Sequence, residues 1–221
     1  MSLLDIIAGD VRAFSAHCPE LMFNERDYQM QLAVFLRQTG HYEDVDVEYF
    51  IPNDIARKAG YEWDSHLRLD IVVRKGGKFA IIELKYTTAR VSRPIKRFGQ
   101  TLPDVEIMKQ QGAQDLVSYN FWKDVRRIEI VKTLFPNVTG GLAVMLTNDP
   151  YYVRGAKSGS LCELFSTADK RKNIHGFLDW TRQTGTTKGL PGFTLDGNYS
   201  VQWYTYEIEN INFFQTIIPV Q

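Results

Sequence analysis

The sequence predicts an α/β protein in which helices pack on a mixed central sheet. Stretches with apolar residues at helical spacing are interspersed with stretches that alternate in the manner of strands. Their order is helix, strand, strand, strand, helix, strand, and further strand-like stretches close the chain. The 221 residues suffice for a single domain, 1–221, that buries a core without disulfides.

Two helices are expected at the start of the chain, over residues 2–18 and 24–40. Both stretches have apolar residues at helical spacing. The second has the clearer ends, because the side chain of Asn24 can accept a hydrogen bond from the first turn and Gly40 can leave the helical conformation.

Three strands are expected next. Residues 44–52 alternate between apolar and polar side chains, which is typical of a half-buried strand. Residues 67–88, "LRLDIVVRKGGKFAIIELKYTT", contain two apolar stretches around Gly76 and Gly77, a pair typical of a hairpin turn. The polar segment 53–65 between them predicts a loop.

The middle of the chain predicts a loop, a long helix and a strand. Residues 89–103 contain two prolines and no acid, which favours a loop. Residues 104–135 are helical in pattern, and Gly112 allows a break. The apolar run 141–149 predicts a buried strand.

The last part of the chain has a weaker pattern. Residues 151–195 are mixed, with a helix expected near 167–180 and a glycine-rich loop after it. Residues 199–208 and 213–221 are rich in aromatic and β-branched residues and predict closing strands.

The composition indicates a soluble cytoplasmic protein. Hydrophobic residues make up 44% of the chain, and 26 basic residues balance 26 acidic ones. The overall charge therefore gives no support to a nucleic-acid partner, although a local basic patch is compatible with it. No run approaches the ~20 apolar residues of a membrane helix, and no signal peptide is visible, so no membrane partner is expected. Cys18 and Cys162 are expected to be free thiols.

The hairpin holds charged residues in an apolar setting. If the two glycines form a two-residue turn, counting back along both strands brings Asp70 opposite Glu83, with Cβ atoms roughly 4.5–5.5 Å apart. Alternation places Lys85 on the same face as Glu83, and it places Leu69 on the same face as Ile71.

Opposed carboxylates repel each other, so something must offset the repulsion. A shared proton, a basic neighbour such as Lys85, or a divalent cation would each do so. Mg²⁺ fits because it prefers carboxylate oxygens. A cross-strand salt bridge on a solvated face is the ordinary alternative.

These residues resemble the PD-(D/E)XK nuclease superfamily, also called restriction-endonuclease-like. Its signature is an acid on one strand, then an acid, any residue and a lysine on the next, and this chain has Asp70 followed by Glu83-Leu84-Lys85. The proline of the signature is missing before Asp70. A glutamate on the first core helix often completes the site in this superfamily, and Glu25 matches it.

The resemblance also implies a fold. The core of the superfamily is helix, three strands, helix, strand, which matches residues 24–148. Residues 151–221 would then be a C-terminal strand extension of a restriction-endonuclease-like core.

By this resemblance the protein is a metal-dependent nuclease that hydrolyses phosphodiester bonds, with DNA as the expected partner and RNA not excluded. Asp70 and Glu83 would bind Mg²⁺, or Mn²⁺ as a substitute, with Glu25 bound through a water molecule. Lys85 would orient the attacking water or pair with the phosphate. A homodimer is compatible with this interpretation, because restriction-type enzymes often cut two strands as dimers.

A local basic patch follows the predicted site. Between Lys85 and Pro103 the chain has basic residues and no acidic one, as phosphate contacts require. Gln111, expected on the next helix, is a further candidate for contacting nucleic acid. The ordinary alternative is a solvated basic loop. The candidate phosphate-binding residues are Arg90, Arg93, Lys96 and Arg97.

Other functions fit the same residues. A catalytically inactive nucleic-acid-binding or scaffold module could share the fold. A small-molecule enzyme or a protein-interaction domain is a third class, because fold alone does not determine function. Glu48, on the polar face of the first strand, is expected to face solvent, with support of the metal-binding carboxylates as the alternative.

Overall fold

The computed structural model describes residues 1–17 and 20–221, so the predicted free thiol at Cys18 lies outside the described residues. The helices are α1 (Leu3–His17), α2 (Glu25–Gln38), α3 (Asn53–Ala56), α4 (Gln114–Leu134) and α5 (Pro150–Arg154), with short 3-10 turns at Arg57–Ala59 and Glu163–Phe165. The strands are β1 (Asp44–Ile51), β2 (Leu67–Lys75), β3 (Lys78–Thr87), β4 (Val91–Arg97), β5 (Gln100–Met108), β6 (Val138–Thr147), β7 (Ile174–Leu178), β8 (Phe193–Tyr199), β9 (Trp203–Ile208) and β10 (Ile211–Val220).

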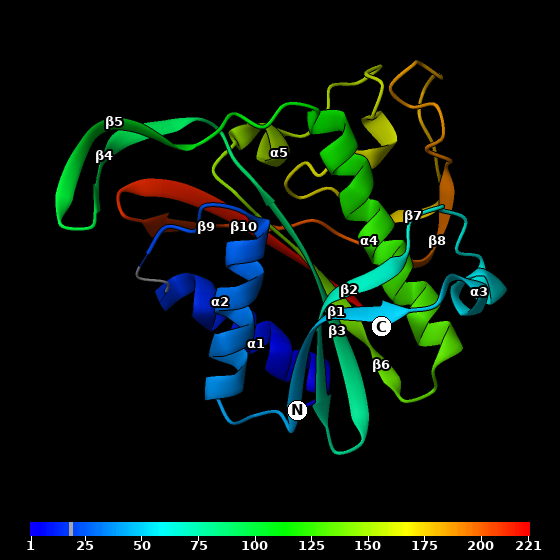
Figure 1. Ribbon diagram of the computed structural model, residues 1–221. Helices are drawn as coiled ribbons and strands as arrows, with labels where there is room; N and C mark the ends of the chain where they lie inside the picture. Colours follow the sequence, from blue (N-terminus) through cyan, green and yellow to red (C-terminus); the bar gives the residue numbers. More distant parts are fainter. Residues whose placement is uncertain (18–19) are drawn as a thin grey trace.

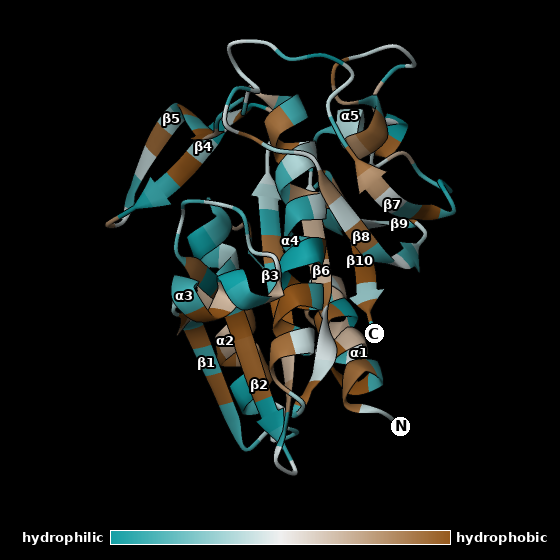
Figure 2. Cartoon of the chain, turned by 90° about the vertical axis from the view of Figure 1, so that its right-hand side faces the viewer, coloured by the Kyte–Doolittle hydropathy of each residue, from teal (hydrophilic) through white to brown (hydrophobic). Residues whose placement is uncertain are grey.

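A mixed sheet with helices on both faces forms the centre of the molecule, which confirms the predicted α/β class. Its strand order is β1-β2-β3-β6-β10-β9. β3 and β6 are parallel, and the other neighbours are antiparallel. Helices α1 and α2 cover one face and α4 covers the other (Figure 1). Figure 2 shows hydrophobic residues along the central strands.

Helix α2 begins as the sequence predicts. The side chain of Asn24 accepts a hydrogen bond of 2.9 Å from the backbone N–H of Asp27, which satisfies one of the free donors of the first turn. Gly40 follows the last turn with a positive φ of 68°. Since the start of α2 is fixed in this way, Glu25 is held at a defined place above the sheet.

The hairpin of β2 and β3 has the predicted register but not the predicted faces. The paired residues run from Lys75–Lys78 to Ile71–Ile82. The next pair in this register would be Asp70 and Glu83. Leu69 packs in the cluster under α4, whereas Ile71 packs in the cluster under α1 and α2. The expectation that these two residues share a face is therefore wrong, because the alternation breaks at Asp70.

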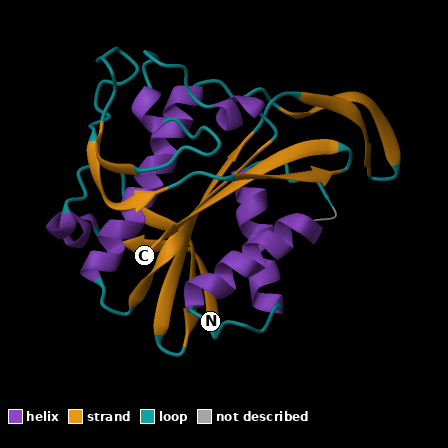
Figure 3. Ribbon diagram, turned by 180° about the vertical axis from the view of Figure 1, so that it is seen from behind, coloured by secondary structure: helices purple, strands orange, loops and turns teal. Residues whose placement is uncertain are grey.

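The loop predicted over 89–103 is wrong. This segment lies in β4 and β5, which pair as a separate two-stranded hairpin projecting from the body (Figures 1 and 3). Pro94 is tolerated because the ladder is irregular between Arg93 and Ile95, where a backbone donor is not required. The long helix predicted from residue 104 begins only at Gln114.

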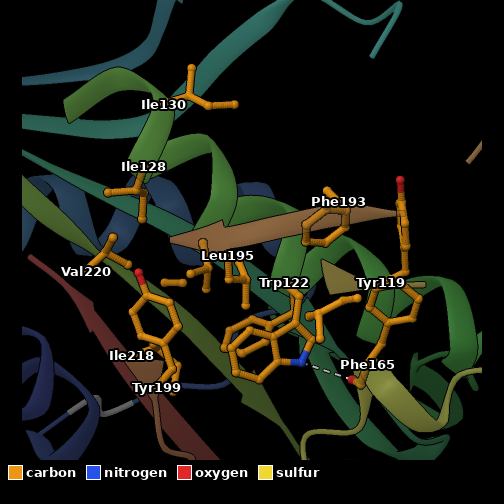
Figure 4. Packing of buried hydrophobic residues seen from close by; sticks show 14 of the residues in the cluster. Tyr119, Trp122, Ile128, Ile130, Phe165, Phe193, Leu195, Tyr199, Ile218 and Val220 are labelled. Atoms are coloured by element: carbon orange, nitrogen blue, oxygen red, sulfur yellow. Dashed lines mark hydrogen bonds between the residues drawn. The ribbon is translucent and has the colours of Figure 1, made fainter. Parts of the chain in front are cut away.

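The helix expected near 167–180 is also wrong, because β7 occupies part of it and pairs with β8. The predicted closing strands are confirmed as β9 and β10. β10 lies inside the central sheet, where it pairs with β6 along most of its length. Aromatic residues of the last third pack on α4, and the indole of Trp122 donates a hydrogen bond of 3.0 Å to the carbonyl oxygen of Phe165 (Figure 4).

Cys162 is a buried free thiol, as predicted. Among the helices of residues 1–17 and 20–221, none has both the length and the apolar character that crossing a membrane would take.

Candidate functional site

The structure brings together all four residues that the sequence predicts as catalytic. Glu25 comes from the start of α2, Asp70 from β2, and Glu83 and Lys85 from β3. Glu25 Oε2 accepts a hydrogen bond of 2.9 Å from the backbone N–H of Tyr86, and its Oε1 lies 4.0 Å from Lys85 Nζ. The first turn of α2 is thus tied to the strand that carries the lysine.

Asp70 and Glu83 hold each other through the backbone of the opposite strand. Asp70 Oδ2 accepts a hydrogen bond of 2.6 Å from the N–H of Leu84, and Glu83 Oε2 accepts a longer one of 3.4 Å from the N–H of Asp70. Each carboxylate thus accepts from a backbone N–H that would donate to a backbone carbonyl in a regular ladder, at the point where that ladder ends. This exchange fixes both side chains at the junction of the two strands.

Helix α4 supplies two charged residues that sequence reasoning missed. Asp124 Oδ2 lies 2.8 Å from Lys85 Nζ, and its Oδ1 accepts a hydrogen bond of 3.0 Å from Arg127 Nη1. Arg127 Nε in turn lies 3.3 Å from Glu83 Oε1. The i, i+3 spacing of Asp124 and Arg127 was the available signal, since it places both on one side of a helix. It does not show that this side faces the site.

Burial raises the pKa of three of these carboxyl groups. The effect is largest at Glu83, whose side chain is fully buried, and the nearby Asp70 and Asp124 add to it while Arg127 opposes it. Burial also raises the pKa of Asp70 and of Glu25, against the attraction of Lys85. These groups therefore resist ionisation unless more positive charge is nearby.

The lysine, unlike these carboxyl groups, keeps its charged form. Burial disfavours its charged form, but the carboxylates of Asp124, Glu25 and Asp70 outweigh burial and raise the pKa of Lys85 above its ordinary value. Lys85 is therefore a cation at neutral pH. This state suits binding of a phosphate oxygen and does not suit a general base.

A polar hollow of about 470 Å³ opens beside the cluster. Gln29 lies at its floor and donates hydrogen bonds of 2.7 Å to the carbonyl oxygen of Asp70 and 3.3 Å to Glu48 Oε1. Glu48 also lines the hollow, with a side chain that is 41% exposed. The lining residues are Asn24, Glu25, Arg26, Gln29, Glu48, Asp70, Tyr86 and Gln111.

The predicted phosphate-binding residues separate into two pairs. Arg90 forms an ion pair of 2.7 Å with Glu106, and Arg93 is paired with Glu209. Lys96 and Arg97, near the tip of the hairpin, form no ion pair with residues 1–17 or 20–221. The charge free for phosphate is therefore concentrated at the tip.

Gln111 lines the hollow, but it precedes α4, so the expectation that it lies on that helix is wrong. Its backbone N–H donates a hydrogen bond of 2.9 Å to the carbonyl oxygen of Thr88. Gln111 is thereby fixed beside the end of β3.

No group of three or more His, Cys, Asp or Glu side chains within the described part of the chain is arranged to hold a metal ion. No protein-family model, curated protein or solved structure matches the sequence or the structure. Any function must therefore be inferred from the geometry and charge of the site.

Proposed function

We propose that the protein is a Mg²⁺-dependent nuclease that hydrolyses phosphodiester bonds, with DNA as its expected substrate. The carrying observation is the charge of the cluster, which is buried except at Glu25. Glu25, Asp70, Glu83 and Asp124 contribute four negative charges when ionised, whereas Lys85 and Arg127 contribute two positive ones. These six residues have an excess of two negative charges (four minus two). Lys123, whose pKa burial and the neighbouring Arg127 lower to about 8, adds at most one positive charge, so a negative charge remains that a divalent cation would offset.

Carboxylate oxygens are the donors that such an ion prefers. Asp70 and Glu83 would hold it, with Glu25 acting through a water molecule. Mg²⁺ commonly uses one or two carboxylates and completes its shell with water and substrate phosphate, so a cluster of three protein ligands is not required. When bound, the ion lowers the pKa of a bound water and stabilises charge on the phosphate oxygens.

The other residues have roles that follow from their contacts. Lys85 is held as a cation by Asp124, and in this proposal it would pair with a phosphate oxygen or orient the attacking water. Glu25 links α2 to β3 and lines the hollow. The order α2, β1, β2, β3, α4, β6 fits the restriction-endonuclease-like core that the sequence motif suggests.

A second candidate function is a catalytically inactive nucleic-acid-binding or scaffold module on the same fold. The observation that favours it is the pairing of both key β3 residues within the protein. Glu83 pairs with Arg127 and Lys85 pairs with Asp124. A site whose charges are already partnered can be structural.

The test is cleavage of plasmid DNA and of short single- and double-stranded DNA and RNA, with Mg²⁺, with Mn²⁺ and with EDTA. We expect metal-dependent cleavage that Asp70→Asn and Lys85→Gln abolish. Asp196→Asn is the matched control, because Asp196 is a largely exposed carboxylate outside the cluster. Cleavage that persists in Asp70→Asn would contradict the proposal.

Calorimetric titration with Mn²⁺ separates the two candidates. Binding that is lost in Asp70→Asn supports the nuclease. A wild-type protein that binds nucleic acid but neither Mn²⁺ nor Mg²⁺ would be the inactive module.

A further inference from the structure

The hairpin of β4 and β5, residues 91–108 and here called the arm, projects away from the body (Figures 1 and 3). The seven residues of β4 span roughly 23 Å at about 3.3 Å per residue. The outer part of the arm is solvent-exposed on both strands. The arm therefore adds little to the core, and its length calls for another explanation.

The tip of the arm carries an aromatic side chain that packs on none of residues 1–17 and 20–221. Phe98 is fully exposed and has a φ of 50°, a conformation that non-glycine residues rarely adopt. Gly99, the other turn residue, also has a positive φ. Two-residue turns of this kind favour Asn or Asp followed by Gly, so neither turn geometry nor packing accounts for a phenylalanine.

Positive charge flanks this aromatic ring. Lys96 and Arg97 precede Phe98 and have no carboxylate partner among residues 1–17 and 20–221, whereas Arg90 and Arg93 nearer the base are paired. The unpaired positive charge of the arm thus lies beside its exposed aromatic residue. Aromatic rings next to cations are the combination that binds single-stranded nucleic acid.

The base of the arm adjoins the candidate site. Tyr86 and Gln111, which flank the two ends of the arm, both line the polar hollow. Thr88 fixes this base, because its carbonyl oxygen accepts from the N–H of Gln111 and its hydroxyl donates to the carbonyl oxygen of Lys109 at 2.9 Å. A nucleic-acid strand bound along the arm would therefore lead toward the site.

Arg97, next to the tip, contacts the segment that leads into α2. Its guanidinium lies 5.3 Å from the centre of the ring of Phe23, and Phe23 immediately precedes Asn24 and Glu25, which line the hollow. No residue of the arm itself lines the hollow, but the segments next to its base and to Arg97 do.

We propose that the arm binds nucleic acid with unstacked bases, with Phe98 stacking on one base and Lys96 and Arg97 contacting the adjoining phosphates. This inference rests on the proposed nuclease function and names its substrate class as single strands, flaps or bulges. Bases within an intact duplex already stack on each other, so they offer no free face to Phe98. The arm thus selects the structure of the strand and not its sequence.

The test is fluorescence-anisotropy binding of the full-length protein in EDTA, so that neither metal nor cleavage contributes. The probes are a labelled thymidine oligonucleotide, a blunt duplex, and the same duplex with unpaired bases. We expect tighter binding to the first and third probes. Phe98→Ala should weaken that binding on the order of tenfold, because it removes one base–aromatic stack. Phe98→Trp should retain it.

Two further variants sharpen the test. Phe177→Ala is the matched control, because Phe177 is also an exposed phenylalanine but lies on β7, away from the arm. It should leave affinity unchanged. The double variant Lys96→Gln/Arg97→Gln should reduce the slope of log affinity against log salt by about 1.4, or about 0.7 for each phosphate that the arm no longer neutralises. Phe98→Ala should leave that slope unchanged.

Each result decides the inference. Equal affinity of Phe98→Ala and wild type for the oligonucleotide would overturn it, as would preference for the blunt duplex. Self-association that depends on Phe98, without nucleic-acid binding, would overturn it in favour of contact between copies. Phe98-dependent binding without any Mg²⁺-dependent cleavage would instead contradict the nuclease proposal and leave the arm inference standing.

Discussion

At the scale of single residues, Asp124 is the counter-ion that the two cations of the site share. It contacts Lys85 through one oxygen and Arg127 through the other. Asp124→Ala leaves both cations largely buried without this partner, so we expect the free energy of unfolding in urea to fall by about 3–5 kcal/mol. Asp196→Ala removes the largely exposed partner of Arg126 and should change the free energy of unfolding by less than about 1 kcal/mol. Equal effects of the two variants would contradict this view of the cluster.

The buried Glu83 predicts a pH dependence with a definite sign. Burial raises its pKa in the folded state above the unfolded value of about 4.3, so in the interval between the two values the folded state binds more protons. The stabilisation that comes from the protonated form is therefore complete below about pH 4.3 and decreases as pH rises toward the folded pKa. Glu83→Gln lacks this dependence.

The measurement is urea unfolding of both proteins over a pH series without divalent metal. We expect the free energy of unfolding of wild type minus that of Glu83→Gln to decrease as pH rises above about 4.3. A difference that increases with pH would mean that Arg127 stabilises the carboxylate more than burial destabilises it.

Sequence reasoning reached part of this site and missed the rest for a physical reason. A two-glycine turn fixes register, so counting from it placed Asp70 near Glu83 correctly. Asp124 and Arg127 lie on a helix that the sequence revealed, but the rotation of that helix depends on packing between distant segments. Local patterns do not contain this information.

At the scale of elements, β6 needs a glycine where it lies beside β3 and under α4. A Cβ at Gly141 would lie 2.6 Å from the carbonyl oxygen of Ile81 and 2.9 Å from Ile128 Cγ2. We expect Gly141→Ala to lower the free energy of unfolding by about 1–3 kcal/mol, because the added methyl overpacks this contact.

Gly9→Ala is the matched control for this prediction. Gly9 lies inside α1 with open space around it, so alanine should stabilise the helix by about 0.5–1 kcal/mol. Thermal unfolding of both variants should therefore shift in opposite directions. A stabilising Gly141→Ala would show that β6 and α4 are not packed this closely.

The errors in the predicted elements also have physical causes. Prolines in residues 89–103 favoured a loop, yet an isolated two-stranded arm accepts Pro94 at a ladder irregularity. The pattern of residues 104–135 merged strand β5 with helix α4, because Ile107 and Met108 are apolar in either conformation. The strand and the helix are separated at Ala113, which has a positive φ and follows Gly112, the residue at which the sequence allowed a break.

At the scale of the whole molecule, the sequence-based division into a core of 24–148 and an extension of 151–221 understates the second segment. β10 lies between β6 and β9 in the central sheet. Phe165 and Phe193 pack around Tyr119 of α4, so the last third also contributes to the core beneath that helix (Figure 4). Neither segment has a complete core without the other.

A chain ending at residue 150 should therefore fail to fold cooperatively. It would leave β6 without its antiparallel neighbour and expose the aromatic face of α4, including Trp122 and Tyr119, which are fully buried in the whole chain. We expect the full-length protein to show one unfolding transition in urea and a near-ultraviolet circular dichroism signal, and the shortened chain to show neither. A shortened chain that unfolds cooperatively would show that residues 1–150 fold without residues 151–221, which would then be an addition to an independent core.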